Sequence, residues 1–65
     1  MLDDVLVAKT YRNMKNQKTY EVIFIALDVT ANKNQYCVVY RPTKGGLVFV
    51  RDLSEFKERF ETAER

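Results

Sequence analysis

The sequence lacks most of what a small protein uses for chemistry or for covalent reinforcement. Among its 65 residues there is no histidine, no tryptophan and only one cysteine, Cys37. One thiol excludes an internal disulfide, and a lone Cys among scattered carboxylates does not make a zinc site. We therefore expect no cofactor. A chain of this length buries only about 60% of its unfolded surface, so we expect either a densely packed core or, as we favour, self-association into a homo-oligomer.

Catalytic motifs are also missing. The chain has no nucleophile beside a plausible base and no glycine-rich phosphate loop of the Walker or dinucleotide type. Cys37 lies in the middle of an expected strand, where a free cysteine is more often a small packing residue than a reactive group. The carboxylates of Glu55, Glu58 and Glu61 fall on an expected helix surface and have the pattern of solvated charges. We therefore predict that the protein is not an enzyme.

Long apolar runs are absent as well. The longest, residues 22–27, has the length of a strand and falls far short of the roughly 18 residues of a membrane span. The N-terminal stretch MLDDVLVAK has acids where a signal peptide has basic residues. Together with the single cysteine, these features predict a cytoplasmic protein without a membrane partner.

The net charge of +2 is small, but it is unevenly distributed. Residues 1–51 contain eight Lys and Arg against four acids, and residues 52–65 contain three against five. The part expected to form strands is therefore basic and the C-terminal part acidic. An excess of this size does not by itself indicate nucleic acid, because binding to an extended phosphate backbone depends on many cations.

Periodicity predicts a single domain, residues 1–65, that is mainly β with one helix. The strands are expected at about 6–12, 18–28, 35–41 and 47–51, and the helix at about 53–63. The stretch KTYEVIFIALD is rich in β-branched and aromatic residues, as strands are. Pro42 and the pair Gly45-Gly46 favour a hairpin turn between the last two strands.

The expected second strand is apolar on both faces. Strict alternation would place Tyr20, Val22, Phe24 and Ala26 on one face, with Glu21, Ile23, Ile25 and Leu27 on the other. Such a strand needs cover on both sides. The α+β fold class that satisfies this best is a small antiparallel SH3-like barrel or a curled four-stranded meander, with a C-terminal amphipathic helix packed against it. A subunit partner would provide the same cover.

The C-terminal helix is indicated by a change of period. Apolar residues recur at helical spacing at Leu53, Phe56, Phe60 and Ala63. Asp52, three residues before Glu55, has the position of an N-cap with a capping-box acid. We expect this helix to place both phenylalanines on the sheet.

A cationic and aromatic set of residues is the strongest candidate for a site. Its members lie near strand ends or in turns: Tyr11, Arg12, Lys15, Tyr20, Tyr40, Arg41, Lys44, Phe49 and Arg51. If Arg41 and Arg51 converge at one end of the sheet, two guanidinium groups can hold a phosphate or carboxylate. Neighbouring rings suit stacking on a planar ligand. The alternative is structural, with the tyrosines in the core and the arginines paired with acids of the C-terminal part.

The chain also resembles a family of short bacterial and phage domains of uncharacterised function. The family pattern is Y-R-H-[FY]-K-G, Y-E-V, V-V-Y-R and G-x-x-W-V-R-P, followed by a short helix with a phenylalanine. The matching pieces span residues 11–60 and are Tyr11-Arg12-Asn13-Met14-Lys15, Tyr20-Glu21-Val22, Val38-Val39-Tyr40-Arg41, Phe49-Val50-Arg51 and Phe56. The departures are Asn13 for the His, Asn16 for the Gly, Phe49 for the Trp and Asp52 for the Pro. The resemblance implies a bacterial host cell and supplies no activity.

These observations favour a non-enzymatic binding module that captures a phosphate-bearing ligand. A nucleotide-like small molecule fits the modest charge better than long nucleic acid does. By analogy, a phage-type protein that sequesters a nucleotide would have these features. One alternative is a protein-interaction adaptor that uses a strand edge or an apolar face. Another is a nucleic-acid-binding small β-barrel.

Overall fold

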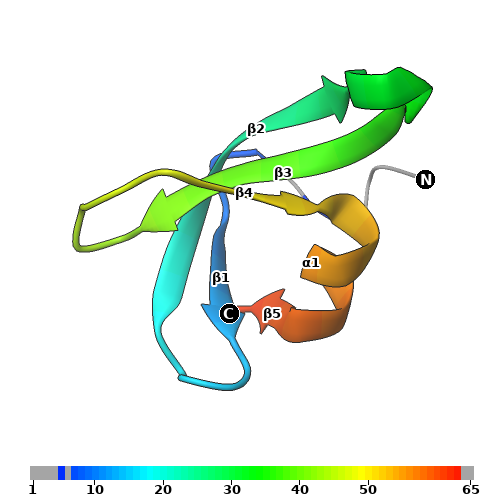
Figure 1. Cartoon of the computed structure of the whole chain (residues 1–65). Helices are drawn as coiled ribbons and strands as arrows, with labels where there is room; N and C mark the ends of the chain where they lie inside the picture. Colours follow the sequence, from blue (N-terminus) through cyan, green and yellow to red (C-terminus); the bar gives the residue numbers. More distant parts are fainter. Residues whose placement is uncertain (1–4, 6, 64–65) are drawn as a thin grey trace.

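The computed structural model describes residue 5 and residues 7–63, and it is mainly β. Five antiparallel strands form one open sheet, in the order β4-β3-β2-β1-β5, with one short α-helix (Figure 1). The elements are β1 (Thr10–Asn13), β2 (Thr19–Asp28), a 3₁₀ turn (Thr30–Asn32), β3 (Gln35–Pro42), β4 (Phe49–Asp52), α1 (Leu53–Arg59) and β5 (Phe60–Thr62). The helix therefore connects the two edge strands of the sheet, β4 and β5.

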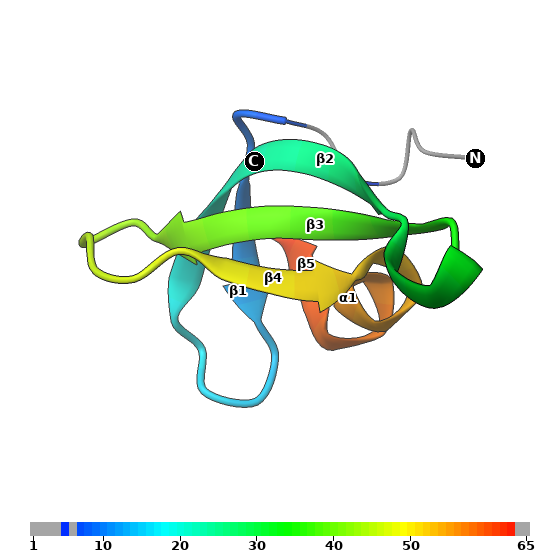
Figure 2. The same ribbon diagram turned by 45° about the horizontal axis from the view of Figure 1, so that its top comes forward.

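The sheet is strongly curved, and its concave side contains the core. Figure 2 shows β2, β3 and β4 side by side, with α1 and β5 behind them. The side chains of Val22 and Val38 in the sheet and of Phe56 in the helix are fully buried. The rings of Phe56 and Phe60 lie parallel, with their centroids 4.1 Å apart. The expected inward orientation of both phenylalanines is thus confirmed by their burial.

A bulge in β2 changes which residues face the core. Val22 lies opposite Tyr40, whereas Phe24 lies opposite Val39, so the register shifts between them. Beyond this shift Ile25, rather than Phe24, faces the core, while Phe24 is 63% exposed on the convex face. The expectation that Tyr20, Val22 and Phe24 share one face was therefore wrong at Phe24, because a bulge inserts a residue into the period of two.

The predicted helix over 53–63 is shorter than expected. It ends at Arg59, and the backbone of Phe60 is extended, with φ −123° and ψ 149°. Residues 60–62 then pair antiparallel with β1 as β5, with Phe60 opposite Asn13. Helical spacing still brings Phe56 and Phe60 together, but hydrogen bonding to the open edge of β1 replaces the last helical turns.

The remaining boundary differences also have local causes. The first strand begins at Thr10 rather than near residue 6, since Ala8 has a positive φ of 70°; residue 6 lies outside the described residues. The fourth strand begins at Phe49 rather than at residue 47, so residues 47–48 precede β4. Asp52 does occupy the N-cap position, but its side chain makes no capping hydrogen bond. The capping-box expectation was therefore wrong, and Glu55 instead pairs with Arg51 and Arg59.

Candidate ligand-binding groove

Two turns far apart in the sequence form a groove at one end of the sheet. One turn, residues 14–18, joins β1 to β2, and the other, residues 43–48, joins β3 to β4. The groove between them has a volume of about 560 Å³ and is lined by Gln17, Lys18, Thr19, Tyr20, Pro42, Thr43, Lys44, Gly45 and Phe49. We call it the turn groove. Its lining includes three of the residues that the sequence selected: Tyr20, Lys44 and Phe49.

The turn groove is cationic. Its lining contains Lys18 and Lys44 and no Asp or Glu. Within the described part of the chain, neither lysine forms an ion pair, whereas Arg12, Arg41 and Arg51 all do. The ammonium groups of Lys18 and Lys44 are therefore available to an anionic ligand in this groove.

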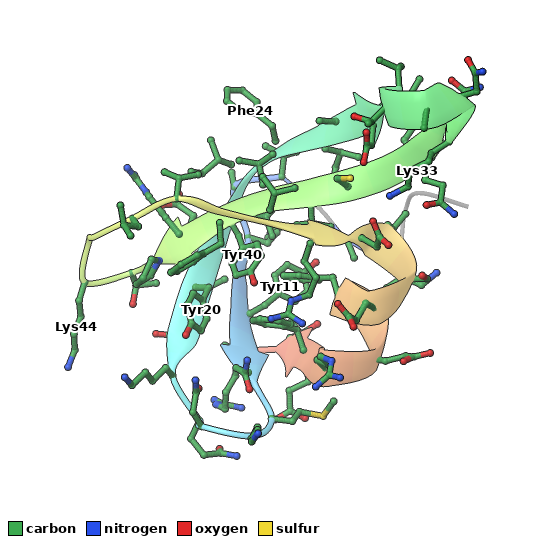
Figure 3. All side chains as sticks on the ribbon, in the orientation of Figure 1. Tyr11, Tyr20, Phe24, Lys33, Tyr40 and Lys44 are labelled. Carbon is green, nitrogen blue, oxygen red and sulfur yellow. The ribbon has the colours of Figure 1, made fainter. Side chains whose placement is uncertain are left out.

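Aromatic rings form the apolar side of the groove. Tyr20 is 9% exposed and meets the Tyr40 ring edge to face at 5.5 Å. Phe49 is 40% exposed and its ring centroid is 5.7 Å from that of Tyr40. Figure 3 shows Tyr20 and Tyr40 on the inner side of the curved sheet, with Lys44 at the tip of its turn. Phe49 thus presents a partly exposed ring that is supported from below by buried ones.

Hydrogen bonds join the two turns into one wall. The hydroxyls of Thr19 and Thr43 lie 2.8 Å apart, and the Thr43 N–H donates to the Thr19 carbonyl at 3.1 Å. The Gly45 N–H donates to the carbonyl of Pro42 at 2.9 Å, with Gly45 at φ 94°. This φ favours glycine, which carries no Cβ. The groove is therefore held by the sheet itself, even though its lysines lie in turns.

Asn13 organises the other turn. Its side-chain oxygen accepts hydrogen bonds from the N–H groups of Lys15 at 2.8 Å and Asn16 at 3.3 Å. The Asn16 side chain in turn accepts from the N–H of Lys18 at 2.8 Å. Short amides bonded to nearby backbone in this way are typical of Asx turns. The side chains of Asn13 and Asn16 thus hold the turn that leads to Lys18.

The predicted convergence of Arg41 and Arg51 is wrong. Arg51 lies opposite the buried Val38, on the concave side, whereas Arg41 lies opposite Glu21, on the convex side. Adjacent residues of a strand point to opposite faces, and Arg41 follows the buried Tyr40. The Arg41 guanidinium pairs with Glu21 at 3.4 Å, at a solvent-exposed position. The two arginines therefore form no common anion site.

Arg51 instead contacts residues of the core and of the helix. Its Nε donates to the Tyr40 hydroxyl at 3.1 Å, and its Nη1 donates to the Glu55 carboxylate at 3.1 Å. Its guanidinium carbon lies 5.8 Å from the centre of the Phe60 ring. The hydrogen bond to Tyr40 is the main cause that raises the pKa of Arg51 above its ordinary value, with the Glu55 charge contributing. This arginine connects β4 to the core and to the helix.

The other expected site residues also lie outside the turn groove. Tyr11 is 6% exposed, and its ring meets that of Phe56 at 5.5 Å in the core. Arg12 pairs with Glu61 of β5 at 3.1 Å. Lys15 lines a second hollow of about 460 Å³, beside Arg51 and both acidic and basic residues of α1. That hollow has mixed charge, so it is a weaker anion site than the turn groove.

Sequence reasoning missed most of the polar wall of the groove. Lys18, Thr19 and Thr43 were not selected, although Thr43 and Lys44 follow the strand-ending Pro42 directly. Nothing in the local pattern reveals that residues 19 and 43 lie side by side. Their proximity follows from the β2–β3 register, in which Tyr20 lies opposite Pro42.

Cys37 behaves as a packing residue. It is 5% exposed, and burial raises the pKa of its thiol, with the charges of Asp28 and Asp52 acting in the same direction. A thiol with a raised pKa is a poor nucleophile at neutral pH. The described residues contain no group of three or more potential metal-ligating side chains. Over the same part of the chain, no helix has the length and apolar character to cross a membrane.

Comparison with known proteins identifies a family. A family model described as a protein of unknown function, DUF1653, matches residues 9–65. Neither the curated proteins nor the solved structures gave a match to this chain. The match covers all five strands and the helix. The chain therefore belongs to the DUF1653 family of proteins of unknown function.

Proposed function

We propose that the chain is a non-enzymatic binding module that captures a phosphate-bearing, nucleotide-like small molecule in the turn groove. The observation that carries this proposal is a partly exposed ring in one hollow with two lysines, which have no acidic partner among the described residues and no Asp or Glu beside them in the lining that these residues form. Its volume of about 560 Å³ lies within the range of small-molecule sites. The predicted ligand class is retained, but its residues are those of the turn groove.

The two halves of such a ligand match the two sides of the groove. Lys18 and Lys44 supply compact positive charges that suit phosphate oxygens. The exposed ring of Phe49 offers a surface on which a base can stack, an interaction worth about 1–3 kcal/mol per base. Tyr40 supports that ring, since it is buried and its ring centroid lies 5.7 Å from that of Phe49. A small ligand with one base and several phosphates satisfies both sides at once.

An extended nucleic acid fits the molecule less well. The arginines that would track a phosphate backbone are each paired with a carboxylate, from Glu61, Glu21 or Glu55. The acids of α1 also place negative charge close to the concave side. Counterion release requires many unpaired cations along one path, and the turn groove supplies only two.

The strand order supports an SH3-like small barrel as part of the same proposal. In such a barrel a meander curls until a short helix connects its last two strands. Here α1 joins β4 to β5, and β5 pairs with β1. The turns at one mouth of such a barrel are well placed for ligands, because the sheet holds them rigidly while their side chains remain exposed.

Isothermal titration with adenosine triphosphate, adenosine and inorganic triphosphate tests the proposal. We expect adenosine triphosphate to bind more tightly than either fragment, since only the whole molecule reaches both sides of the groove. Lys44→Gln should weaken binding about fivefold, because one charge pair at 4 Å is worth about 1 kcal/mol in water. Phe49→Ala should weaken it further.

Lys33→Gln is the matched control. Lys33 lies at the opposite end of the β2–β3 hairpin from Lys44 (Figure 3), where it pairs with Asp28 at 3.5 Å. The same change of charge there should leave binding unaltered. Equal losses from both lysine variants, or no binding of any phosphate compound, would refute the proposal. Tighter binding of an oligonucleotide, with a steep salt dependence, would favour the nucleic-acid alternative.

A further inference from the structure

The edge strand β4 is unusually apolar for an edge. Its sheet neighbour is β3, and no described strand lies on its other side. Leading into and along this edge are four consecutive apolar residues that are all exposed: Leu47 (77%), Val48 (53%), Phe49 (40%) and Val50 (65%). Natural proteins protect such edges with lysine, proline, bulges or a covering segment. None of these four positions carries a charge or a proline, so the edge is open to another strand.

The convex face continues this apolar surface inward from the edge. Val50 lies opposite Val39, and Val39 lies opposite Phe24, which forms one row across β4, β3 and β2. Phe24 points away from the core in Figure 3 and is 63% exposed. The row is therefore an apolar stripe that ends at an unprotected strand edge. An edge and a stripe of this kind are features of strand-addition interfaces.

We propose that the partner of this edge is a second copy of the chain, paired antiparallel through β4 about a twofold axis at Phe49. In that register Phe49 faces its own copy, and Val48 faces Val50 of the other chain. Directly opposed residues of antiparallel strands share a face, so Phe49 meets Phe49 on the concave side, and the pairing would compete with stacking of the proposed ligand on this ring. The valines meet on the convex side and extend the stripe across both molecules. Every opposed side chain in the centre is apolar.

Charge complementarity favours the same arrangement. The turn that precedes β4 carries Lys44, whereas Asp52 ends the strand and Glu55 follows it in α1. Antiparallel pairing brings the basic end of one strand to the acidic end of the other. Parallel pairing would instead place the two Lys44 side chains together. An interface about a twofold axis is isologous, which means that both subunits use the same surface. Such an interface closes the assembly at two subunits.

A neighbouring register is less favourable. A twofold axis at Val50 would place Phe49 opposite Arg51 and Val48 opposite Asp52. That register would leave one apolar pair at the centre, Val50 against Val50. The axis at Phe49 gives three apolar pairs, with Leu47 opposite Arg51 at each end. Since a shift in register changes every opposed pair, this comparison favours the axis at Phe49 over one at Val50. A disulfide trap at Phe49 distinguishes it from an axis at Val48, which would place Leu47 opposite Phe49.

Analytical ultracentrifugation from micromolar to hundreds of micromolar protein tests the inference. We expect the mass to rise with concentration from the 7.7 kDa monomer to twice that value. Val48→Lys and Val50→Lys should each keep the protein monomeric throughout, because each places an ammonium group opposite a valine at the centre of the pairing. Phe24→Lys should dimerise as the wild type does, since Phe24 lies two strands away from the edge. Circular dichroism should show that all three variants remain folded, as each position is at least half exposed.

Disulfide trapping tests the register. Phe49→Cys should oxidise to a covalent dimer, whereas Phe24→Cys should not, and the buried Cys37 serves as the internal control. A wild type that stays monomeric at every concentration would overturn the inference. So would a dimer abolished by Phe24→Lys and retained by Val50→Lys, which would indicate packing between convex faces. A monomer that binds an extended apolar peptide would assign the edge to a foreign partner instead.

Discussion

Replacing Arg51 with alanine should destabilise the protein much more than replacing Arg41. The two arginines end neighbouring stretches of the chain and have the same charge, but the structure gives them different surroundings. Arg51 is 29% exposed and contacts Tyr40, Glu55 and the ring of Phe60. Arg41 is 52% exposed and pairs only with Glu21, itself 40% exposed, among the contacts seen in the described residues.

The magnitudes follow from these contacts. The hydrogen bond from Arg51 to Tyr40 is worth about 0.5–1.5 kcal/mol. The contact with the Phe60 ring contributes about 0.5–1 kcal/mol, and the pair with Glu55 contributes about 0.3–0.5 kcal/mol. Their sum is about 1.3–3 kcal/mol. The exposed pair of Arg41 is worth about 0–1 kcal/mol. A domain of this length has a total stability of only about 3–10 kcal/mol, so the difference should be large in any unfolding assay.

Urea denaturation, followed by circular dichroism, measures these losses in free energy of unfolding. In a thermal scan the Arg51→Ala variant should melt at least about 5 °C below the wild type, given about 4–8 °C per kcal/mol for a domain of this size. Arg41→Ala serves as the matched control. The Tyr40→Phe variant removes only the hydroxyl, and a double-mutant cycle with Arg51→Ala should give a coupling of about 0.5–1.5 kcal/mol.

Two results would refute this reasoning. Equal destabilisation by Arg41→Ala and Arg51→Ala would mean that the faces assigned to the two residues do not govern their energetics. Strict additivity in the cycle would mean that the hydroxyl of Tyr40 and the guanidinium of Arg51 do not interact. Either outcome would also remove the reason for treating Arg51 as a structural residue rather than a ligand-binding one.

Three further predictions concern the core, the thiol and one loop carboxylate. Phe56→Ala should cost about 3–5 kcal/mol, because the ring is fully buried against Phe60; loss of the cooperative melting transition would show it. Cys37 should react with iodoacetamide more slowly than free cysteine at pH 8 and at a normal rate in unfolding urea, because burial raises the pKa of its thiol. The Thr30 N–H donates to Asp28 and lowers the pKa of that carboxyl below its ordinary value. A carboxyl whose pKa is lowered by folding stabilises the protein above its unfolded pKa of about 3.9, and this stabilisation is lost as the pH falls through the folded-state pKa. In denaturation series below pH 5, the free energy of unfolding should therefore fall less steeply with pH in Asp28→Asn than in the wild type.

Local patterns were sufficient for several features of the fold. The β-branched stretch around Val22 forms a strand, and residues 43–48 form a turn at Gly45 and Gly46, where both φ values are positive. Phe56 and Phe60 face the core as their spacing predicted. These features depend on intrinsic backbone preference and on the period of apolar residues, which neighbours in sequence already determine.

The site was harder to predict, because its residues meet through strand register. Thr19 and Thr43 lie 24 positions apart in the chain and share a hydrogen bond of 2.8 Å between their hydroxyls. Of the cationic and aromatic set that the sequence selected, Tyr20, Lys44 and Phe49 line the turn groove. The arginines of that set are held by carboxylates instead. Composition alone does not say which cation will find an acid across the sheet.

The sequence by itself determined the β-rich content of this protein, its hairpins and the inward placement of its helical phenylalanines, because each depends on contacts or dihedral preferences within a few residues. Only the tertiary structure decided the rest. One bulge in β2 exposes Phe24, and hydrogen bonding to β1 turns residues 60–62 into a strand. Pairing of β3 with both neighbours sends Arg41 and Arg51 to opposite faces. In each case the deciding interaction is a backbone ladder between distant segments, whose register no local pattern specifies.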